Sequence, residues 1–298
     1  MKIAHISDIH LSYRYKSHNF DKLIKILEYV SGNSFDHLVI TGDITHTAQK
    51  YDFQSLKEIL KTFGMYNNQK TTIIIGNHDI FGGVVTAEDV YNFPIKCKNT
   101  DYKKQVNNFF NHFSELYENC SFPDPENVYP FIKTVGDVAF FGLNSIAEYS
   151  YIKNPLASNG KLCKKDFTVL KTAVNSVEIK SKFKIALIHH HFSRFKKDNV
   201  HLNNYFWNKI EKNTMKLRKK NKILKLFKTM DVKLVLHGHI HIYSDYLKSG
   251  IHFINAGNSI ENGNEKELLI NMIEIDKNKM TSNQVNPLEK RIFSHINY

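Results

Sequence analysis

The sequence predicts an α/β fold, and three observations support this prediction. Short runs of β-branched and apolar residues alternate with amphipathic segments of helical period along the first 80 residues. Each apolar run ends at a polar corner that contains Asp, Asn, His or Gly. The order strand, corner, helix, strand is the βαβ pattern, in which ligands collect beyond the carboxyl ends of the strands. A chain of 298 residues is long enough for one large α/β domain.

The first third of the chain supplies three of the predicted strands and two helices. The strands are expected at 2–7, 37–41 and 71–75, where Ile, Val, Leu and Thr dominate. Apolar residues recur at helical spacing in the two intervening segments, so we expect helices over 21–30 and 53–63.

Residues 80–130 interrupt this alternation. The segment contains the Gly82-Gly83 turn, four prolines and a single amphipathic stretch, which predicts one helix over 102–117. We therefore interpret 80–130 as an excursion from the core and not as a separate domain.

The regular alternation resumes after this excursion. Further strands are expected at 131–135, 138–143, 183–188, 232–236, 243–248, 251–256 and 268–275. A helix is expected near 166–177, and a long basic helix over 208–230. This predicts a single domain over 1–275, followed by a polar C-terminal tail over 276–298 that docks loosely.

Composition limits the class of protein. Lys and Arg number 41 against 29 Asp and Glu, a formal charge of +12 that favours anionic partners such as phosphate esters, nucleic acid or acidic lipid. A lysine-rich compositional bias is the plainer explanation. Three cysteines without a CxxC pair exclude a disulfide scaffold and a thiolate zinc finger, and they predict a cytoplasmic protein. No apolar run approaches the roughly 20 residues of a membrane span, which leaves surface contact as the one membrane association to consider.

Five of the polar corners carry side chains that can bind metals. They hold Asp8 and His10, then Asp43, then Asn77 and His78, then His189, and finally His239 and His241. Carboxylate, imidazole and carboxamide groups are ligands for Mn²⁺, Fe²⁺ or Zn²⁺. The absence of cysteine from this set argues against a structural zinc site.

The motifs Asp8-x-His10, Gly42-Asp43, Gly76-Asn77-His78-Asp79 and Gly238-His239-x-His241, with the strand-terminal His189, resemble those of the calcineurin-like metallophosphoesterases. The resemblance runs from residue 3 to about residue 259. It implies a four-layer α/β/β/α sandwich with a helical insertion around 80–130.

The resemblance also implies a centre of two divalent metal ions. Asp8, His10 and His241 would hold the first ion, Asn77, His189 and His239 the second, and Asp43 would bridge both. Manganese or iron (Fe²⁺ or Fe³⁺) is expected, with Zn²⁺ as the alternative. His78 would act on the substrate phosphate as hydrogen-bond donor or general acid, and Asp79 would fix the orientation of His78.

The histidine corner leaves two assignments open. Related sequences often have a proline soon after it, whereas here Phe192 follows His191. We prefer His189 to His190 as the ligand because His189 comes directly off the strand. His190 and Arg194 are then expected to contact substrate. His46, three residues after Asp43, is either a turn residue or a support for the ligands.

These features predict a hydrolase that cuts a phosphomonoester or phosphodiester by attack of a metal-bridging hydroxide. A small-molecule or cyclic-nucleotide diester is the preferred substrate. The alternatives are a DNA exonuclease or endonuclease and a pyrophosphohydrolase of a lipid-linked nucleotide, and a remote alternative is a non-catalytic metal-binding scaffold. The sequence leaves the exact ester, the native metals and the oligomeric state open.

Overall fold

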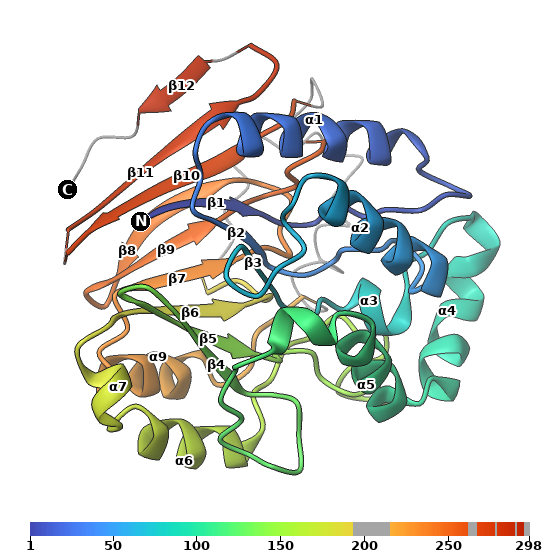
Figure 1. Cartoon of the computed structure of the whole chain (residues 1–298). Coiled ribbons are helices and arrows are strands. Elements are labelled where there is room, and N and C mark those ends of the chain that lie inside the picture. Colours follow the sequence, from blue (N-terminus) through green and yellow to red (C-terminus); the bar gives the residue numbers. More distant parts are fainter. Residues whose placement is uncertain (193–214, 262–266, 278, 290, 295–298) are drawn as a thin grey trace.

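The computed structural model describes residues 1–192, 215–261, 267–277, 279–289 and 291–294. The described residues form two six-stranded sheets that lie face to face, with helices on both outer sides (Figure 1). The layers therefore run helix, sheet, sheet, helix, and the predicted four-layer α/β/β/α sandwich is confirmed.

The first sheet combines strands from both ends of the described chain. Its order is β12-β11-β10-β1-β2-β3, in which β1 (Lys2–Ile6), β2 (His37–Ile40) and β3 (Thr71–Ile73) run parallel. On the other side of β1, β10 (Ile270–Asp276), β11 (Lys279–Asn286) and β12 (Arg291–Ser294) are antiparallel additions. β1 thus lies between β2 and β10, with Ile3 opposite His37 on one side and Ile273 on the other.

The second sheet has the order β4-β5-β6-β7-β9-β8. Its central strands β5 (Val138–Leu143), β6 (Phe183–Ile188), β7 (Leu234–His237) and β9 (Ile251–Asn255) are parallel. The edge strands β4 (Phe131–Val135) and β8 (Ser244–Lys248) pair antiparallel with their neighbours. Parallel sheets need both faces covered, and the helices and the first sheet provide that cover.

Helices close the outer faces of the sandwich. α1 (His18–Gly32) and α2 (Lys50–Thr62) lie outside the first sheet, and α6 (Lys164–Ala173), α7 (Val177–Lys180) and α9 (Lys220–Thr229) lie outside the second (Figure 1). Side chains of β6 alternate between two cores: Ile185 and Leu187 pack in the larger one, whereas Ala186 and Ile188 pack in the one that contains α6 and α9. The alternation shows that the second sheet is buried on both faces.

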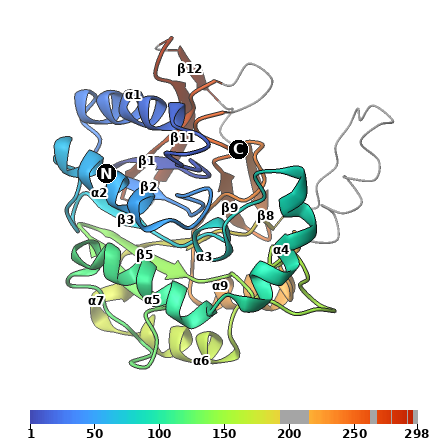
Figure 2. The same cartoon turned by 90° about the vertical axis from the view of Figure 1, so that its right-hand side faces the viewer.

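The excursion after residue 80 is helical, as predicted. α3 (His78–Phe81), α4 (Ala87–Asn99) and α5 (Tyr102–His112) lie along one side of the sandwich (Figure 2), and the short 3₁₀ helix η1 (Ser114–Tyr117) follows α5. The helix expected over 102–117 is therefore two elements. α4 was not predicted, because Pro94 within it signals a helix break and the apolar Val90 and Ile95 are exposed.

Two predicted segments differ in the structure. Residues 208–214 of the expected basic helix lie outside the described residues. Residues 215–219 are not helical: Leu217 forms an isolated β-bridge with Gly160, and Lys219 has a φ of +58°, so α9 begins only at Lys220. The described part of the expected polar tail is not loosely docked either, since β11 extends the first sheet along the full length of β10.

A search of the described residues finds no helix with the length and apolar character that crossing a membrane requires.

Candidate metal centre

The candidate ligands lie on loops that leave the carboxyl ends of strands in both sheets. Asp8, Asp43 and Asn77 follow β1, β2 and β3 of the first sheet, whereas His189 and His239 follow β6 and β7 of the second. Stacking the two sheets brings these ends together. The structure therefore collects side chains that are up to 233 residues apart, from Asp8 to His241, in one place.

The first cluster contains Asp8, His10 and His241, whose ligand atoms all lie within 4.8 Å of one another. The Nε2 atoms of His10 and His241 are 3.1 Å apart, and His241 Nε2 is 3.5 Å from Asp8 Oδ1. Asp8 is held from the other side, because its two carboxylate oxygens accept hydrogen bonds of 3.2 and 3.0 Å from the backbone N–H of His239. The two motifs at opposite ends of the chain thus support each other directly.

The second cluster contains Asp43, His189 and His239, again with all ligand atoms within 4.8 Å. His189 Nε2 is its central atom: it lies 3.2 Å from Asn77 Oδ1, 3.2 Å from His239 Nδ1 and 3.3 Å from Asp43 Oδ2. Asn77, which the sequence placed in this set, is therefore within reach of the same centre.

Hydrogen bonds distinguish His189 from His190. The Nδ1–H of His189 donates to the carbonyl oxygen of Thr41 at 2.8 Å, which leaves the Nε2 lone pair for the cluster. His190 is fully buried and uses both ring nitrogens, Nδ1 with Ser145 Oγ at 2.8 Å and Nε2 with Ser158 O at 3.1 Å. No ring nitrogen of His190 is left for a substrate, contrary to our expectation. Arg194, the other expected substrate contact, lies outside the described residues.

Asp43 lies among positively polarised groups. Its Oδ1 accepts the backbone N–H of His78 at 2.7 Å, and its Oδ2 faces His189. Burial alone would raise the pKa of the Asp43 carboxyl, but His189 and His78 outweigh burial and hold that pKa well below its usual range. Burial likewise disfavours the charged form of His189, and the carboxylate of Asp43 overcomes it, raising the pKa of His189 to about 9. The opposite pKa shifts of Asp43 and His189 have the same cause, because each charged group stabilises the charge of the other.

His78 lies beside the first cluster, with its ring centroid 4.6 Å from that of His10. Its Nδ1 is 3.2 Å from the carbonyl oxygen of His46, and because a carbonyl only accepts, Nδ1 carries the proton of this hydrogen bond. Burial lowers the pKa of His78. The ring is therefore oriented by the backbone of residue 46, with Nε2 as the nitrogen left for other partners.

Among the described residues Asp79 has no direct hydrogen bond to the ring of His78, so its predicted orienting role would be indirect, through the loop that carries His46. Its Oδ1 accepts from the N–H and hydroxyl of Thr45 at 2.8 and 3.2 Å, and its Oδ2 accepts from the N–H groups of Gly76 and Ile44 at 2.9 and 3.3 Å. Burial, followed by the charge of Asp43, raises the pKa of Asp79 to about 7. Asp79 thus ties the loop after β2 to the loop after β3.

Comparison with known proteins agrees with this geometry. The family model of the calcineurin-like phosphoesterases matches residues 1–243, most of the chain. This chain belongs to the calcineurin-like phosphoesterase family. The predicted family is therefore confirmed, and membership supports a hydrolase that acts on phosphoric esters.

Individual proteins match this phosphoesterase over a short stretch of sequence or at low sequence identity. A DNA double-strand break repair protein Mre11 from Archaeoglobus fulgidus is 31% identical over 87 residues, which are 26% of this chain and 19% of that protein. This chain thus matches about a fifth of the length of that curated relative. Among solved structures, a dimetal phosphatase from Danio rerio has a TM-score of 0.63 at 10% identity and 99% coverage of both chains. A purple acid phosphatase from yellow lupin has a TM-score of 0.59 at 11% identity, with 99% of this chain and 52% of that one covered. These two likenesses show a shared fold.

The ligand loops of this phosphoesterase contain strained backbone, and two of their glycines lie close to ligand carboxylates. Asp8, His10, Asp43 and His239 all have positive φ angles, between 43° and 72°, which non-glycine residues rarely adopt. Two motif glycines allow backbones to meet. A Cβ on Gly76 would lie 2.3 Å from Asp43 Oδ1, and a Cβ on Gly238 would lie 2.2 Å from Asp8 Oδ2. Gly76 and Gly238 therefore cannot carry a side chain unless the carboxylates of Asp43 and Asp8 move.

The donor set fits divalent cations. His10 Nε2 lies 3.1 Å from His241 Nε2, and His239 Nδ1 lies 3.2 Å from His189 Nε2, beside the carboxylates of Asp8 and Asp43. A cation between them would bind the lone pairs of nitrogens and carboxylates that face one another. The His and Asp clusters can therefore hold metal ions, as is usual in this family.

The structure shows the surroundings of His46, for which the sequence left two roles open. The ring of His46 stacks on that of His78 at 5.5 Å, and ligand atoms of His10, His46 and His78 also lie within 4.8 Å of one another. His46 is therefore more than a turn residue. Its position three residues after Asp43 was the available signal, but that spacing alone does not show which way the loop returns.

Proposed function

We propose that this phosphoesterase hydrolyses a phosphomonoester or phosphodiester at a centre of two divalent metal ions. The observation that supports the proposal best is the convergence of five loops from two sheets on two adjacent clusters of carboxylate and imidazole ligands. A non-catalytic scaffold has no need of the oriented His78 beside those clusters.

The two clusters divide the ligand roles. Asp8, His10 and His241 would hold one ion, Asn77, His189 and His239 the other, and Asp43 would bridge both. Mn²⁺ or iron is the proposed identity, with Zn²⁺ as the alternative. When bound, such a pair of ions polarises the phosphoryl oxygens and lowers the pKa of water to roughly 7. The protein contributes the orientation: Thr41 O sets the ring of His189, and Asp79 keeps the loops after β2 and β3 at a fixed separation.

His78 is the proposed catalytic residue, and it is not one of the proposed metal ligands. Its Nδ1–H is held by the carbonyl of His46, so the ring presents Nε2 to the substrate. Because Nδ1–H is already bonded to His46 O, donation from Nε2 to a phosphoryl oxygen or to the departing alkoxide uses the cationic form of the ring, which burial disfavours and an anionic phosphate beside it would favour.

The preferred substrate is a small phosphodiester, and DNA is the second candidate. The match to an Mre11 protein and the net charge of +12 favour nucleic acid. If DNA is the substrate, log affinity for it will fall steeply and linearly with log salt, because neutralised phosphates release counterions. An activity on bis-p-nitrophenyl phosphate without salt-dependent DNA binding would exclude this candidate. A cytoplasmic location stays a prediction.

The decisive experiment measures hydrolysis of p-nitrophenyl phosphate and bis-p-nitrophenyl phosphate with added Mn²⁺, before and after treatment with a chelator. We expect turnover that the chelator abolishes and fresh Mn²⁺ restores. Two bound metal ions per chain without turnover of either ester would instead support the scaffold.

A further inference from the structure

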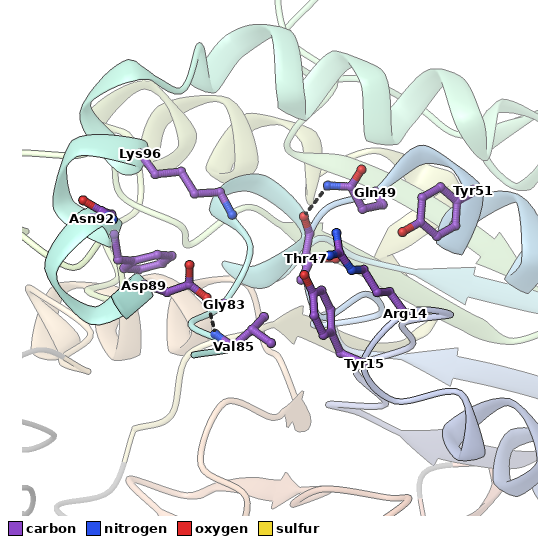
Figure 3. Close-up of a pocket in the computed structure, with 11 residues that line it drawn as sticks. Arg14, Tyr15, Thr47, Gln49, Tyr51, Gly83, Val85, Asp89, Asn92 and Lys96 are labelled. Carbon is purple, nitrogen blue, oxygen red and sulfur yellow. Dashed lines mark hydrogen bonds between the residues drawn. The ribbon is translucent and has the colours of Figure 1, made fainter. Parts of the chain in front are cut away.

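A cavity of about 270 Å³ is lined in part by Gly83, which is a neighbour of His78. Arg14 and Tyr15 come to it from the loop after β1, Thr47 from the loop after β2, and Gly83, Phe93 and Lys96 from the helical excursion (Figure 3). Figure 3 shows Lys96 reaching from α4 toward the side that carries Arg14 and Tyr15. None of these residues belongs to the metal clusters.

At Gly83 the lining of this cavity is hydrogen-bonded to the carbonyl of His46, which also holds His78. The N–H of Gly83 donates to the carbonyl of His46 at 2.7 Å, the same carbonyl that receives His78 Nδ1. A Cβ on Gly83 would lie 2.5 Å from His78 Cε1, so the imidazole packs against this glycine. The cavity and the ring of His78 thus lie on either side of Gly83.

The cavity carries two cations and one engaged carboxylate. Arg14 and Lys96 do not take part in the ion pairs found among the described residues. The acidic residue in the lining, Asp89, accepts the N–H groups of Val85 and Thr86 at 3.0 and 2.8 Å and so caps α4. An arginine and a lysine on opposite sides of a cavity are suited to a phosphate group, since a guanidinium binds its oxygens in a fork and an ammonium adds a second charge.

Aromatic rings stand beside both cations. The guanidinium carbon of Arg14 is 5.2 Å from the ring centroid of Tyr15, and Lys96 Nζ is 5.9 Å from that of Phe93. Tyr15 is 42% exposed and so offers ring surface to a ligand. Stacking on such a ring is worth roughly 1–3 kcal/mol per base in proteins that bind single-stranded nucleic acid.

We propose that this cavity is a subsite for the leaving group, and that the leaving group carries a second phosphate and a planar ring, as a nucleotide does. The proposal rests on the proposed phosphoesterase function and narrows its substrate. Arg14 and Lys96 bind the second phosphate while His78 serves the scissile one. A diester between two nucleosides with a terminal phosphate meets this description, whereas a simple cyclic mononucleotide has no second phosphate.

The proposal is tested first by binding, which needs no turnover. We expect thymidine 3′,5′-bisphosphate to bind the Mn²⁺-loaded protein at least about tenfold more tightly than thymidine 5′-monophosphate, as befits one charge-assisted phosphate contact. Arg14→Gln and Lys96→Gln should each remove most of this preference. Lys98→Gln is the matched control, since Lys98 is an exposed lysine of the same helix that does not line the cavity. Equal binding of the two nucleotides, or equal losses in Lys96→Gln and Lys98→Gln, would overturn the subsite.

Kinetics then separate this proposal from the proposed function. The substrates are the dinucleotide TpT and its two forms with one more terminal phosphate, pTpT and TpTp. We expect one phosphorylated form to exceed TpT at least about tenfold in kcat/KM, with the ratio falling toward one in Arg14→Gln and Lys96→Gln. If p-nitrophenyl esters are cut but the three dinucleotides react equally, the subsite is wrong and the phosphoesterase stands. If no ester is cut while the bisphosphate preference persists, the proposed function and the leaving-group role both fail, and only nucleotide binding in the cavity stands.

Discussion

Backbone carbonyls decide which ring nitrogen two histidines of this site, His189 and His78, present. The carbonyl of Thr41 takes Nδ1–H of His189, and the carbonyl of His46 takes Nδ1–H of His78. Both rings therefore turn Nε2 away from the carbonyl that holds them, although one is a proposed ligand and the other a proposed donor. The difference between the two roles lies in the neighbours of Nε2, which are Asp43, Asn77 and His239 for His189.

The first prediction concerns His78. His78→Ala should bind two Mn²⁺ ions with unchanged stoichiometry but lower kcat about 10²-fold or more, because a donor to the transition state is lost while the ligands remain. Metal content by elemental analysis and kcat on bis-p-nitrophenyl phosphate provide the readouts. An unchanged kcat would remove His78 from the catalytic machinery.

The second prediction concerns Gly238. In Gly238→Ala, the new Cβ would meet Ser7 Oγ at 2.0 Å and Asp8 Oδ2 at 2.2 Å, so the Asp8 carboxylate must move. We expect weaker Mn²⁺ binding, measured by calorimetry, together with loss of turnover. Gly32→Ala is the control, since nothing lies within 4 Å of its added Cβ. Equal metal affinity in both variants would contradict the proposed packing.

At the scale of elements, the sequence predicts those strands and ligand loops whose signal lies within a few consecutive residues. Strands such as β6 are short apolar runs with a polar corner, and each corner carries its ligand within a few residues. α4 has too few buried apolar residues for its period to be visible. The role of Asp79 depends on Ile44 and Thr45, which come near only once β2 and β3 pair. β11 is a polar run, and its pairing with β10 is decided by the sheet and not by its own composition.

Lys133 of β4 gives a third prediction. Its ammonium is buried, donates to Thr71 O of β3 at 2.8 Å and so links edge strands of the two sheets. Burial lowers the pKa of Lys133 to about 8, below the 10.5 expected in the unfolded chain. Between pH 8 and 10.5 the unfolded state therefore binds more protons, and this lysine makes the folded state more stable as pH rises.

The free energy of unfolding of the wild type should thus increase relative to that of Lys133→Met between pH 8 and 10.5, as measured by urea denaturation without metal. Lys228→Met, at an exposed position of α9, should show no such trend. A constant difference between wild type and Lys133→Met across this range would show that Lys133 titrates normally.

At the scale of the whole molecule, the metal centre joins the two sheets. Three of its ligand loops belong to the first sheet and two to the second. Ions that bind only the folded state stabilise it by about 2.7 kcal/mol when present at 100 times Kd. The fourth prediction is therefore a clear fall in Tm when a chelator strips the protein, reversed by Mn²⁺.

The control for this prediction is Asp43→Ala, which lacks the proposed bridging carboxylate. Its Tm should respond weakly to chelator and Mn²⁺, and its activity should be absent. An active Asp43→Ala protein, or one with the full Mn²⁺ response, would refute the bridging role.

The position of β1 has a consequence for synthesis on the ribosome. β1 carries the Asp8 loop and pairs on one side with β2, but its other side waits for β10, more than 260 residues later in the chain. During translation the nascent first sheet therefore exposes an open edge until β10 has left the exit tunnel. Exposed strand edges of this kind attract other chains. Pairing with β10 thus removes from β1 an edge at which the growing polypeptide could associate with other chains.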